Sequence, residues 1–139
     1  RLFDQASGWF DQGGGDFESI HEYFLPLKIK AKDRDRVVAL TEYGGYAWHE
    51  PDHSMFDHDY GYKTFHSRDE LTKGVGAMVR RDVLSNIMNG LNAAIYTQVS
   101  DVEEEVNGIY TYDREVLKFN EEELIAWNKS IIDEWNDFC

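Results

Sequence analysis

Three short runs of apolar residues predict strands that are covered on both faces. The clearest run spans residues 37–40, a second spans residues 93–96, and a weaker one spans residues 19–23. Their apolar residues are continuous rather than alternating, a pattern typical of strands in a parallel sheet. Residues 1–3 predict the end of a further strand. The turn signal Asn89-Gly90 precedes the run at 93–96.

Two segments carry apolar residues at helical spacing behind a capping signal. Ser67 is followed three residues later by Glu70, the arrangement of a capping box, and Gly90 predicts where that helix stops. Asn120 with the acidic residues 121–123 repeats the device before the C-terminal helix. The apolar stripes of the two helices predict core packing, and their members are Leu71, Val75, Met78, Val79, Val83 and Ile87 in the first and Leu124, Trp127, Ile131 and Trp135 in the second.

Strands alternate with helices along the chain, which predicts an α/β fold with a parallel sheet. The glycine-rich stretch 12–16 lacks the spacing of a phosphate-binding loop, and residues 109–119 predict a small hairpin. In parallel α/β folds, ligands bind at the C-terminal ends of the strands. Glu42 ends the best strand and precedes Gly44 and Gly45, so it occupies the position at which this rule places chemistry.

Composition narrows the class of protein. The chain has 139 residues, 42% hydrophobic and 29% charged, which fits one folded domain. Its formal net charge of −13 disfavours nucleic acid and anionic membranes as partners. It contains no apolar run of the ~20 residues that cross a bilayer. Cys139 is the single cysteine, so neither an intrachain disulfide nor a cysteine-based metal site is expected, and the compartment stays open between cytoplasm and a secreted or periplasmic location.

Glu42 has two interpretations on spacing alone. It is either a solvated or salt-bridged carboxylate at a strand end, or one member of the carboxylate pair that hydrolyses glycosides. Partners for such a pair within the chain lie just beyond the strand at residues 93–96; they are Asp101, Glu103, Glu104 and Glu105.

Histidines raise a rival hypothesis of metal-dependent hydrolysis. His49, His53 and His58 lie close together in sequence, beside Asp52 and Asp57. His49-Glu50-Pro51-Asp52-His53 has the HExxH spacing, but the stretch reads as an irregular loop and not as the helix on which that motif binds zinc, so we predict no metal site and no cofactor. A GxSxG nucleophile elbow is missing, which argues against a serine hydrolase.

Aromatic residues gather outside the predicted helices, among them Trp9, Tyr43, Tyr46, Trp48 and Tyr62. They are either core and loop anchors or a platform that packs against sugar rings. Tyrosine and tryptophan suit the second role because they join a flat apolar face to a polar edge.

Four stretches in order resemble the C-terminal half of the catalytic barrel of glycoside hydrolase family two, the β-galactosidase and β-glucuronidase family. They are Ala6-Ser7-Gly8-Trp9 with the glycine-rich stretch up to Asp16, Ser19-Ile20-His21-Glu22-Tyr23, Leu40-Thr41-Glu42-Tyr43-Gly44-Gly45, and Tyr96-Thr97-Gln98-Val99-Ser100-Asp101-Val102-Glu103. The resemblance implies strands five to eight of a TIM (β/α)₈ barrel, covering residues 1–139 as a fragment of that domain.

The resemblance makes Glu42 similar to the family's catalytic nucleophile and Tyr23 similar to the tyrosine that hydrogen-bonds it. We therefore expect the Tyr23 hydroxyl to lie within reach of the Glu42 carboxylate. His21 would lie nearby and bind substrate, and Trp9, Tyr43 and Trp48 would form pocket wall. The family has asparagine where this chain has Glu22, and a tryptophan near Tyr96 or Thr97, so no catalytic role is carried onto the last strand.

The implied activity is hydrolysis of a β-glycosidic bond with retention, on a carbohydrate substrate. The family's acid/base glutamate would precede Arg1, so we expect this chain to need the rest of a parent enzyme, an N-terminal half-barrel and β-sandwich domains. Alone it should be inactive and tend to self-associate through unpaired strand edges. The alternative from another class is a non-catalytic carbohydrate-binding or scaffolding domain that uses the same aromatic residues.

Overall fold

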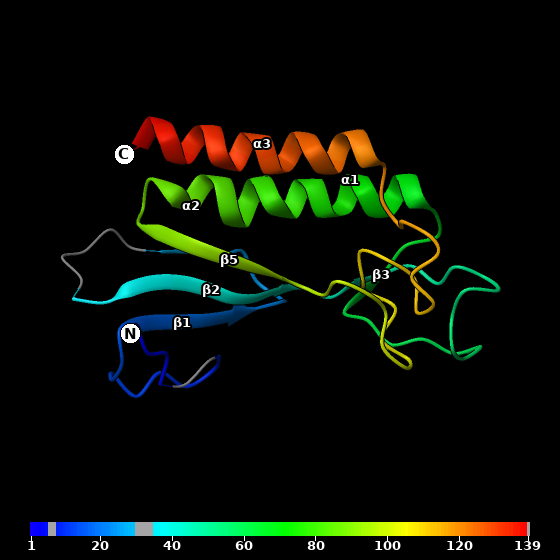
Figure 1. Cartoon of the computed structure of the whole chain (residues 1–139), viewed down its shortest axis with the longest axis horizontal. Helices are drawn as coiled ribbons and strands as arrows, with labels where there is room; N and C mark the ends of the chain where they lie inside the picture. The colour runs from blue at the N-terminus through cyan, green and yellow to red at the C-terminus, as the bar shows by residue number, and fades with distance from the viewer. Residues whose placement is uncertain (6–7, 30–34, 139) are drawn as a thin grey trace.

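The computed structural model describes residues 1–5, 8–29 and 35–138 and centres on a three-stranded parallel sheet. Its strands are β1 (Phe17–Glu22), β2 (Val37–Gly44) and β5 (Leu91–Thr97), in the order β1-β2-β5. All three point the same way, toward a group of long loops (Figure 1). The prediction of an α/β fold with β2 parallel to both neighbours is confirmed.

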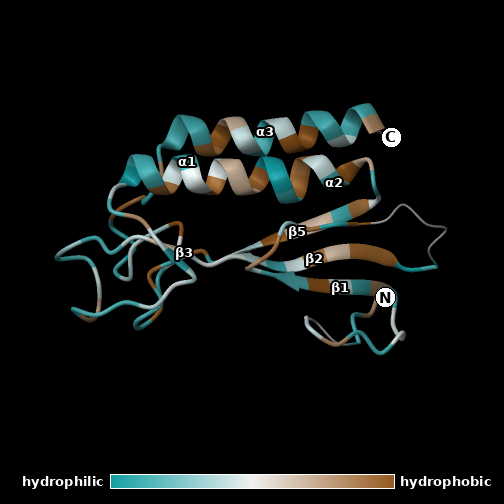
Figure 2. Ribbon diagram, turned by 180° about the vertical axis from the view of Figure 1, so that it is seen from behind, coloured by the Kyte–Doolittle hydropathy of each residue, from teal (hydrophilic) through white to brown (hydrophobic). Residues whose placement is uncertain are grey.

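Helices cover one face of this sheet (Figures 1 and 2). The first helical segment runs through α1 (Arg68–Met78), the π-helical turn η1 (Val79–Leu84) and α2 (Ser85–Ile87); the second is α3 (Glu121–Phe138). None of the helices in the described part of the chain has the length and apolarity that a membrane crossing requires. The apolar stripes predicted from the sequence form the surface through which the helices pack against the sheet.

The ends of the helices follow the predicted signals, except that the Glu70 and Asn120 side chains bond to partners other than those of a capping box. Ser67 accepts a hydrogen bond from the Glu70 backbone N–H, at 3.2 Å, as an N-cap. Glu70 in turn accepts from the N–H of His66 at 3.0 Å, one residue before the position that a capping box uses. Gly90 has a φ of 97°, which suits the left-handed stop. Asn120 donates its side-chain amide to Asp69 at 3.0 Å and so ties the start of α3 to α1.

The core lies between β2 and the helices. Val38, Leu40 and Tyr43 project from β2 into a cluster with side chains of α1, η1 and α3, among them Leu71, Val75, Met78, Val79, Val83 and Trp127. Figure 2 shows the apolar colouring of much of β2 and β5, and the alternation of apolar and hydrophilic residues along the helices. Each such side chain gains roughly 1.5–3 kcal/mol when it is fully buried.

Strand β2 contains an extra residue, Thr41, that changes which way its side chains point. Ile20 pairs with Leu40 and the next residue, His21, pairs with Glu42, so Thr41 has no counterpart on β1. Leu40 and Tyr43 are three positions apart and yet both lie in the core, whereas a regular strand would place them on opposite faces. This β-bulge therefore turns Glu42 onto the face away from the helices.

The loops that follow β2 and β5 lie side by side at the C-terminal edge of the sheet. The first loop contains β3 (Tyr46–Ala47) and β4 (Lys63–Thr64), which pair in parallel. Trp48 N–H donates to the Val106 carbonyl at 3.0 Å, and Tyr60 N–H donates to the Glu104 carbonyl at 2.6 Å. The second loop returns through an antiparallel bridge between Tyr110 and Leu117, a reduced form of the hairpin predicted there.

Residues 1–3 do not form the fourth strand that was predicted. Phe3 donates its N–H to the Asp16 carboxylate at 2.6 Å and accepts from the Asp16 N–H at 2.7 Å, so its backbone bonds are used within the N-terminal loop. Leu2 and Phe3 are exposed. The described sheet therefore holds three strands, and β1 leaves its outer edge without a strand partner among the described residues.

A buried ion pair holds the loop after β5 together. The Lys118 ammonium lies 2.8 Å and 2.9 Å from the two Asp101 carboxylate oxygens, and both side chains are 0% exposed. Lys118 also donates to the Val106 carbonyl, and Asp101 accepts from the Gly108 N–H. Burial raises the pKa of Asp101 and lowers that of Lys118, and each shift is opposed by the charge of the partner.

We predict that Lys118→Met destabilises the fold by about 3–5 kcal/mol, because it leaves a buried carboxylate without its counter-charge. The double variant Asp101→Asn with Lys118→Met should recover most of that loss, since asparagine is neutral and still accepts from the Gly108 N–H. Urea denaturation followed by tryptophan fluorescence measures both. Equal loss in the single and double variants would contradict this role.

Candidate functional site

Two side chains, Tyr23 and His21, lie against one carboxylate oxygen of Glu42. The Tyr23 hydroxyl donates to Glu42 Oε2 at 2.9 Å, and His21 Nδ1 lies 3.1 Å from the same oxygen. The parallel register places His21 beside Glu42, and Tyr23 follows directly after β1. The predicted contact between Tyr23 and Glu42 is confirmed. Within the described part of the chain no hydrogen bond occupies Oε1, and the Glu42 side chain is 43% exposed.

Tyr23 is a protonated donor at neutral pH. Burial raises the pKa of its hydroxyl to about 12; a hydrogen bond from Thr97 acts the other way, and the Glu42 charge raises the pKa further. The phenol therefore keeps its proton over the whole physiological range. It is therefore available throughout that range as a donor to Glu42 Oε2.

His21 is fixed by close packing against Gly8. A Cβ atom at residue 8 would come within 2.8 Å of the imidazole ring, and Gly8 has a φ of 103°, so glycine is required there on both grounds. The His21 side chain is 9% exposed. Its Nε2 is buried and has no hydrogen-bond partner among the described residues. The ring is thus oriented by packing on one side and by Glu42 on the other.

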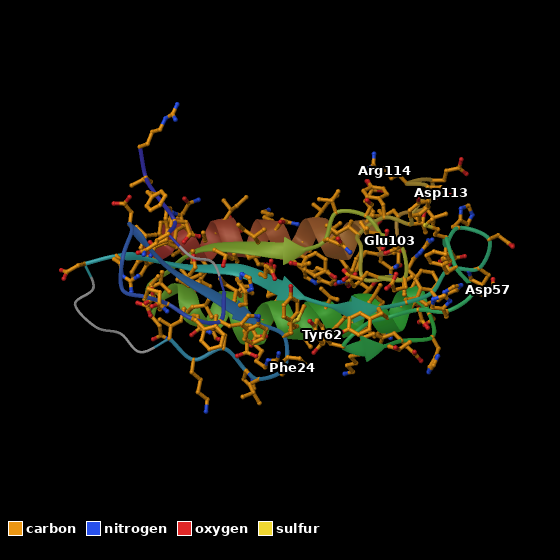
Figure 3. All side chains as sticks on the ribbon, turned by 90° about the horizontal axis from the view of Figure 1, so that it is seen from below. Phe24, Asp57, Tyr62, Glu103, Asp113 and Arg114 are labelled. Atoms are coloured by element: carbon orange, nitrogen blue, oxygen red, sulfur yellow. The ribbon has the colours of Figure 1, made fainter. Side chains whose placement is uncertain are left out.

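A pocket of about 270 Å³ opens beside Glu42 at the C-terminal edge of the sheet. Its aromatic lining residues are Trp9, Tyr23, Tyr60 and Tyr62, and its other lining residues are Glu42, Gly61, Thr97, Glu105 and Asn107. Figure 3 shows the rings of Phe24 and Tyr62 close together, whose centroids are 4.8 Å apart in an edge-on arrangement. The pocket therefore combines aromatic rings with carboxylate, hydroxyl and amide groups.

Two of the four residues predicted to bind substrate lie at this pocket. Trp9 lines it, is 55% exposed, and has its ring centroid 6.2 Å from that of His21. His21 contacts Glu42 directly. Two residues of the N-terminal motif, Ala6 and Ser7, lie outside the described residues.

Tyr43 and Trp48 do not line the pocket, and their predicted positions in its wall are wrong. Tyr43 is 6% exposed and packs edge-on against Tyr96 in the core, where burial raises the pKa of its hydroxyl to about 12. It neighbours Glu42 in sequence, and adjacent residues of a strand point to opposite faces. Trp48 packs against the same core and is bonded through its backbone to Val106.

Tyr62 and Gly45 complete the pocket in a way that the sequence motifs did not predict. The Tyr62 ring lies 4.6 Å from that of Tyr23, between centroids. A Cβ atom at Gly45 would come within 2.2 Å of the Tyr62 ring, and Gly45 has a φ of 68°. The second glycine of the pair therefore makes room for an aromatic ring beside Tyr23. The aromatic clustering in the sequence contained Tyr62, but its position depends on the loop fold.

The acidic segment after β5 contributes one carboxylate to the pocket. Asp101 is buried with Lys118, and Glu103 is exposed in the loop, where Figure 3 labels it. Glu105 lines the pocket and accepts a hydrogen bond from Gln98 Nε2 at 3.2 Å. The same amide group donates to Asn107 Oδ1 at 3.0 Å. Of the four candidate partners for Glu42, Glu105 is therefore the one in its pocket.

Glu22, which stands where the resembling family has asparagine, has a local structural role. Its Oε1 accepts from the backbone N–H groups of Phe24 and Leu25, at 2.9 Å and 2.7 Å. These bonds close the turn that follows β1 and so fix the backbone around Tyr23. The departure from the family pattern is compatible with the position of Tyr23 beside Glu42.

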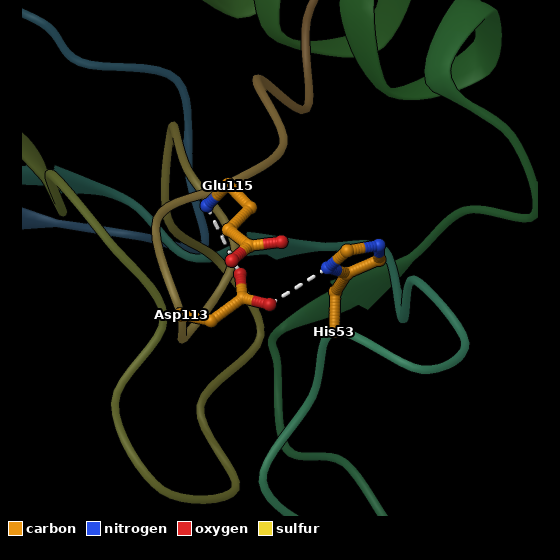
Figure 4. Close-up of side chains that lie close together, drawn as sticks. All are labelled: His53, Asp113 and Glu115. Atoms are coloured by element: carbon orange, nitrogen blue, oxygen red, sulfur yellow. Dashed lines mark hydrogen bonds and ion pairs between the residues drawn. The ribbon is translucent and has the colours of Figure 1, made fainter.

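The three histidines of the rival metal hypothesis do not converge. His58 stacks on Phe56 with ring centroids 5.2 Å apart, and His53 Nδ1 lies 2.7 Å from Asp113 Oδ2 (Figure 4). Across the described ranges, the group with metal-ligand spacing is His53, Asp113 and Glu115, whose ligand atoms lie within 4.8 Å of one another. The other Asp113 oxygen accepts from Thr111 and from the Glu115 N–H. This arrangement acts as an ion pair between the two loops.

The chemistry available at the site centres on Glu42. One carboxylate oxygen accepts a hydrogen bond from Tyr23 and lies against His21, while the other has no hydrogen bond among the described residues and is open to a ligand. The aromatic rings around it supply flat apolar surface with polar edges. No protein-family model matches the chain, and no curated protein matches it.

We predict that His53 titrates above its ordinary value and that Asp113→Asn lowers its pKa. The hydrogen bond to Asp113 raises the pKa of His53, and the bonds from Thr111, Glu115 N–H and His53 lower that of Asp113 to about 2. The ion pair therefore stabilises the loops fully between about pH 4 and 6.5. It is lost below as Asp113 protonates near pH 2, and above as His53 deprotonates through its raised pKa.

NMR titration of the His53 ring protons measures the shift. Asp57→Asn is the matched control, because it removes the same charge from the loop that carries His53 without touching the hydrogen bond. A His53 pKa that responds equally to both substitutions would show that general loop charge, rather than Asp113, sets it.

Proposed function

We propose that the chain is the C-terminal half of the catalytic TIM (β/α)₈ barrel of a retaining β-glycosidase, with Glu42 as its nucleophile. One observation carries the proposal: Glu42 Oε2 is held by Tyr23 and His21 inside a pocket lined by aromatic rings. The resemblance of the sequence to glycoside hydrolase family two assigns the same roles to Glu42 and Tyr23. Two independent grounds thus support the same pair of residues.

The mechanism follows from the free carboxylate oxygen. Glu42 Oε1 attacks the anomeric carbon of the sugar, the bond to the leaving group breaks, and a covalent glycosyl-enzyme forms. Tyr23 and His21 hold Oε2 and so orient the attacking oxygen. A second carboxylic acid protonates the leaving group and then deprotonates the water that releases the sugar. That acid belongs to another part of the parent enzyme in this proposal.

The sheet edges support the idea of an incomplete barrel. A full barrel has eight strands in about 250 residues, with helices outside and ligands at the C-terminal ends of the strands. Strand β5 has Ile95 exposed, and a groove of about 380 Å³ lies beside it, lined by residues of β5, α2 and α3. A further strand and helix would cover these surfaces. Uncovered, they favour the self-association expected of the isolated chain.

The second candidate function is non-catalytic carbohydrate binding by the same aromatic residues. Trp9 and Phe24 favour it, because both side chains are more than half exposed and their ring centroids are 6.3 Å apart, with Trp9 lining the pocket and Phe24 packed against its lining residues. Aromatic faces of this kind pack against sugar rings whether or not a bond is broken. The two functions differ in whether the Glu42 carboxylate is needed for turnover or contributes to affinity alone.

We predict that Glu42→Gln in the full-length parent protein lowers kcat for a chromogenic β-galactoside or β-glucuronide by on the order of 10³ or more. Glutamine still accepts from Tyr23, so the pocket geometry is kept while the nucleophile is lost. Glu103→Gln is the matched control, since it removes one exposed carboxylate outside the pocket. The isolated 139-residue chain should release no product, because a retaining site needs an acid/base carboxyl group beside the nucleophile, and this proposal places that group in another part of the parent enzyme. Product release by the isolated chain would instead make Glu105 the first suspect for that group.

Near-normal turnover by Glu42→Gln would remove the nucleophile assignment. If the unsubstituted protein binds the sugar without turnover, and Glu42→Gln weakens that binding, the result would favour the binding module. NMR of the first-formed anomer decides the stereochemistry, and an inverted product would contradict a covalent intermediate on Glu42.

We predict that Tyr23→Phe lowers kcat about 10–100-fold and changes KM little. The substitution keeps the ring but removes the donor to Glu42 Oε2, and a hydrogen bond to a charged group contributes roughly 1.5–3 kcal/mol. Tyr112→Phe, which removes a hydroxyl from an exposed loop position, serves as the control. A rise in KM with unchanged kcat would mean that Tyr23 binds substrate and does not orient the nucleophile.

A further inference from the structure

We propose that Glu105 and Asn107 form a wall that binds sugar hydroxyls, and that this pocket selects a neutral pyranoside over a uronic acid. The proposal deepens the proposed function and rests on it, because it takes a sugar as the ligand of the pocket. Neither residue was among those that the sequence assigned to substrate. Both line the pocket into which Glu42 projects.

The wall presents an acceptor and a donor side by side. Gln98 Nε2 donates to Glu105 Oε2 and to Asn107 Oδ1, at 3.2 Å and 3.0 Å. This bridge leaves Glu105 Oε1 as an acceptor and the Asn107 Nδ2 group as a donor toward the pocket. A pair of adjacent sugar hydroxyls matches such a wall, because each hydroxyl both donates and accepts.

The wall is also held in place by its backbone. Asn107 is 5% exposed although it lines the pocket, and its carbonyl accepts from the Tyr96 hydroxyl at 3.4 Å. Tyr60 pairs with Glu105 in an isolated bridge, which joins this segment to the loop after β2. A binding group fixed in this way loses little conformational entropy when the ligand arrives.

Charge decides which sugars fit. Glu42 and Glu105 place two carboxylates around a pocket of about 270 Å³, so the carboxylate of a bound uronic acid would lie within several ångströms of both. Like charges at such distances repel by an amount that corresponds to roughly tenfold or more in affinity at the effective dielectric of a protein surface. A neutral hydroxymethyl group at the same carbon meets no such repulsion and can donate to a carboxylate.

The test compares ligands that differ at one carbon. Calorimetric titration of the full-length parent protein would use methyl 1-thio-β-galactoside and its galacturonide, and the matching glucoside and glucuronide; these thioglycosides resist hydrolysis. We expect the neutral member of the preferred pair to bind at least tenfold more tightly. Glu105→Gln should weaken the neutral sugar about tenfold and bring the two affinities closer together. Glu105→Lys should reverse the preference toward the uronide.

Glu104→Gln is the matched control, because it removes the same charge from the adjacent exposed residue, outside the pocket lining, and should change neither affinity. The proposal is overturned if the uronide binds as tightly as the neutral sugar, if neither binds, or if Glu104→Gln and Glu105→Gln act alike. Its failure is distinct from failure of the proposed function. If hydrolysis depends on Glu42 but Glu105 does not affect the choice between neutral sugar and uronide, only the proposed role of Glu105 and Asn107 is wrong. If the protein distinguishes the two sugars but hydrolyses neither, only the proposed enzymatic activity is wrong.

Discussion

The extra residue at Thr41 is the constraint on which the site depends. It lets Leu40 and Tyr43 both enter the core while Glu42, between them and next to the core, faces the opposite side. A regular strand would place either the carboxylate among apolar side chains or the tyrosine in the pocket, and an unpaired buried carboxylate is costly. The Thr41 hydroxyl donates to the Ile20 carbonyl at 3.3 Å and so supports the irregular register.

Around this bulge the site is assembled from segments far apart in sequence. Tyr23 and His21 come from the end of β1, Tyr62 comes from the loop after β2, and Glu105 from the loop after β5. The parallel sheet brings the ends of the strands to one edge, and backbone bonds between the loops set their spacing. The pocket is therefore a property of the sheet edge and of both loops together.

The elements that could be predicted are those whose signals are local. Continuous apolar runs marked β2 and the sheet, and Ser67 with Glu70 marked the first helix; family resemblance placed Tyr23 beside Glu42. The position of Tyr43 was missed because a bulge depends on pairing between strands, which no periodicity within one strand reveals. The position of Trp48 was missed because it depends on the loop that its backbone contacts at Val106. Glu105 was one of several acids in a row, and only the loop fold separates it from Asp101 and Glu103.

The buried pair of Lys118 and Asp101 has a consequence for how the second loop moves. Its charges bind the Val106 carbonyl and the Gly108 N–H as well as each other, so the segment formed by residues 101, 106, 108 and 118 cannot come apart without leaving a buried charge short of a partner. Such a segment opens as one cooperative unit instead of fraying from its tip. In hydrogen exchange, the amide of Gly108 should therefore follow the slow opening of the whole unit, although it sits in a loop without regular secondary structure.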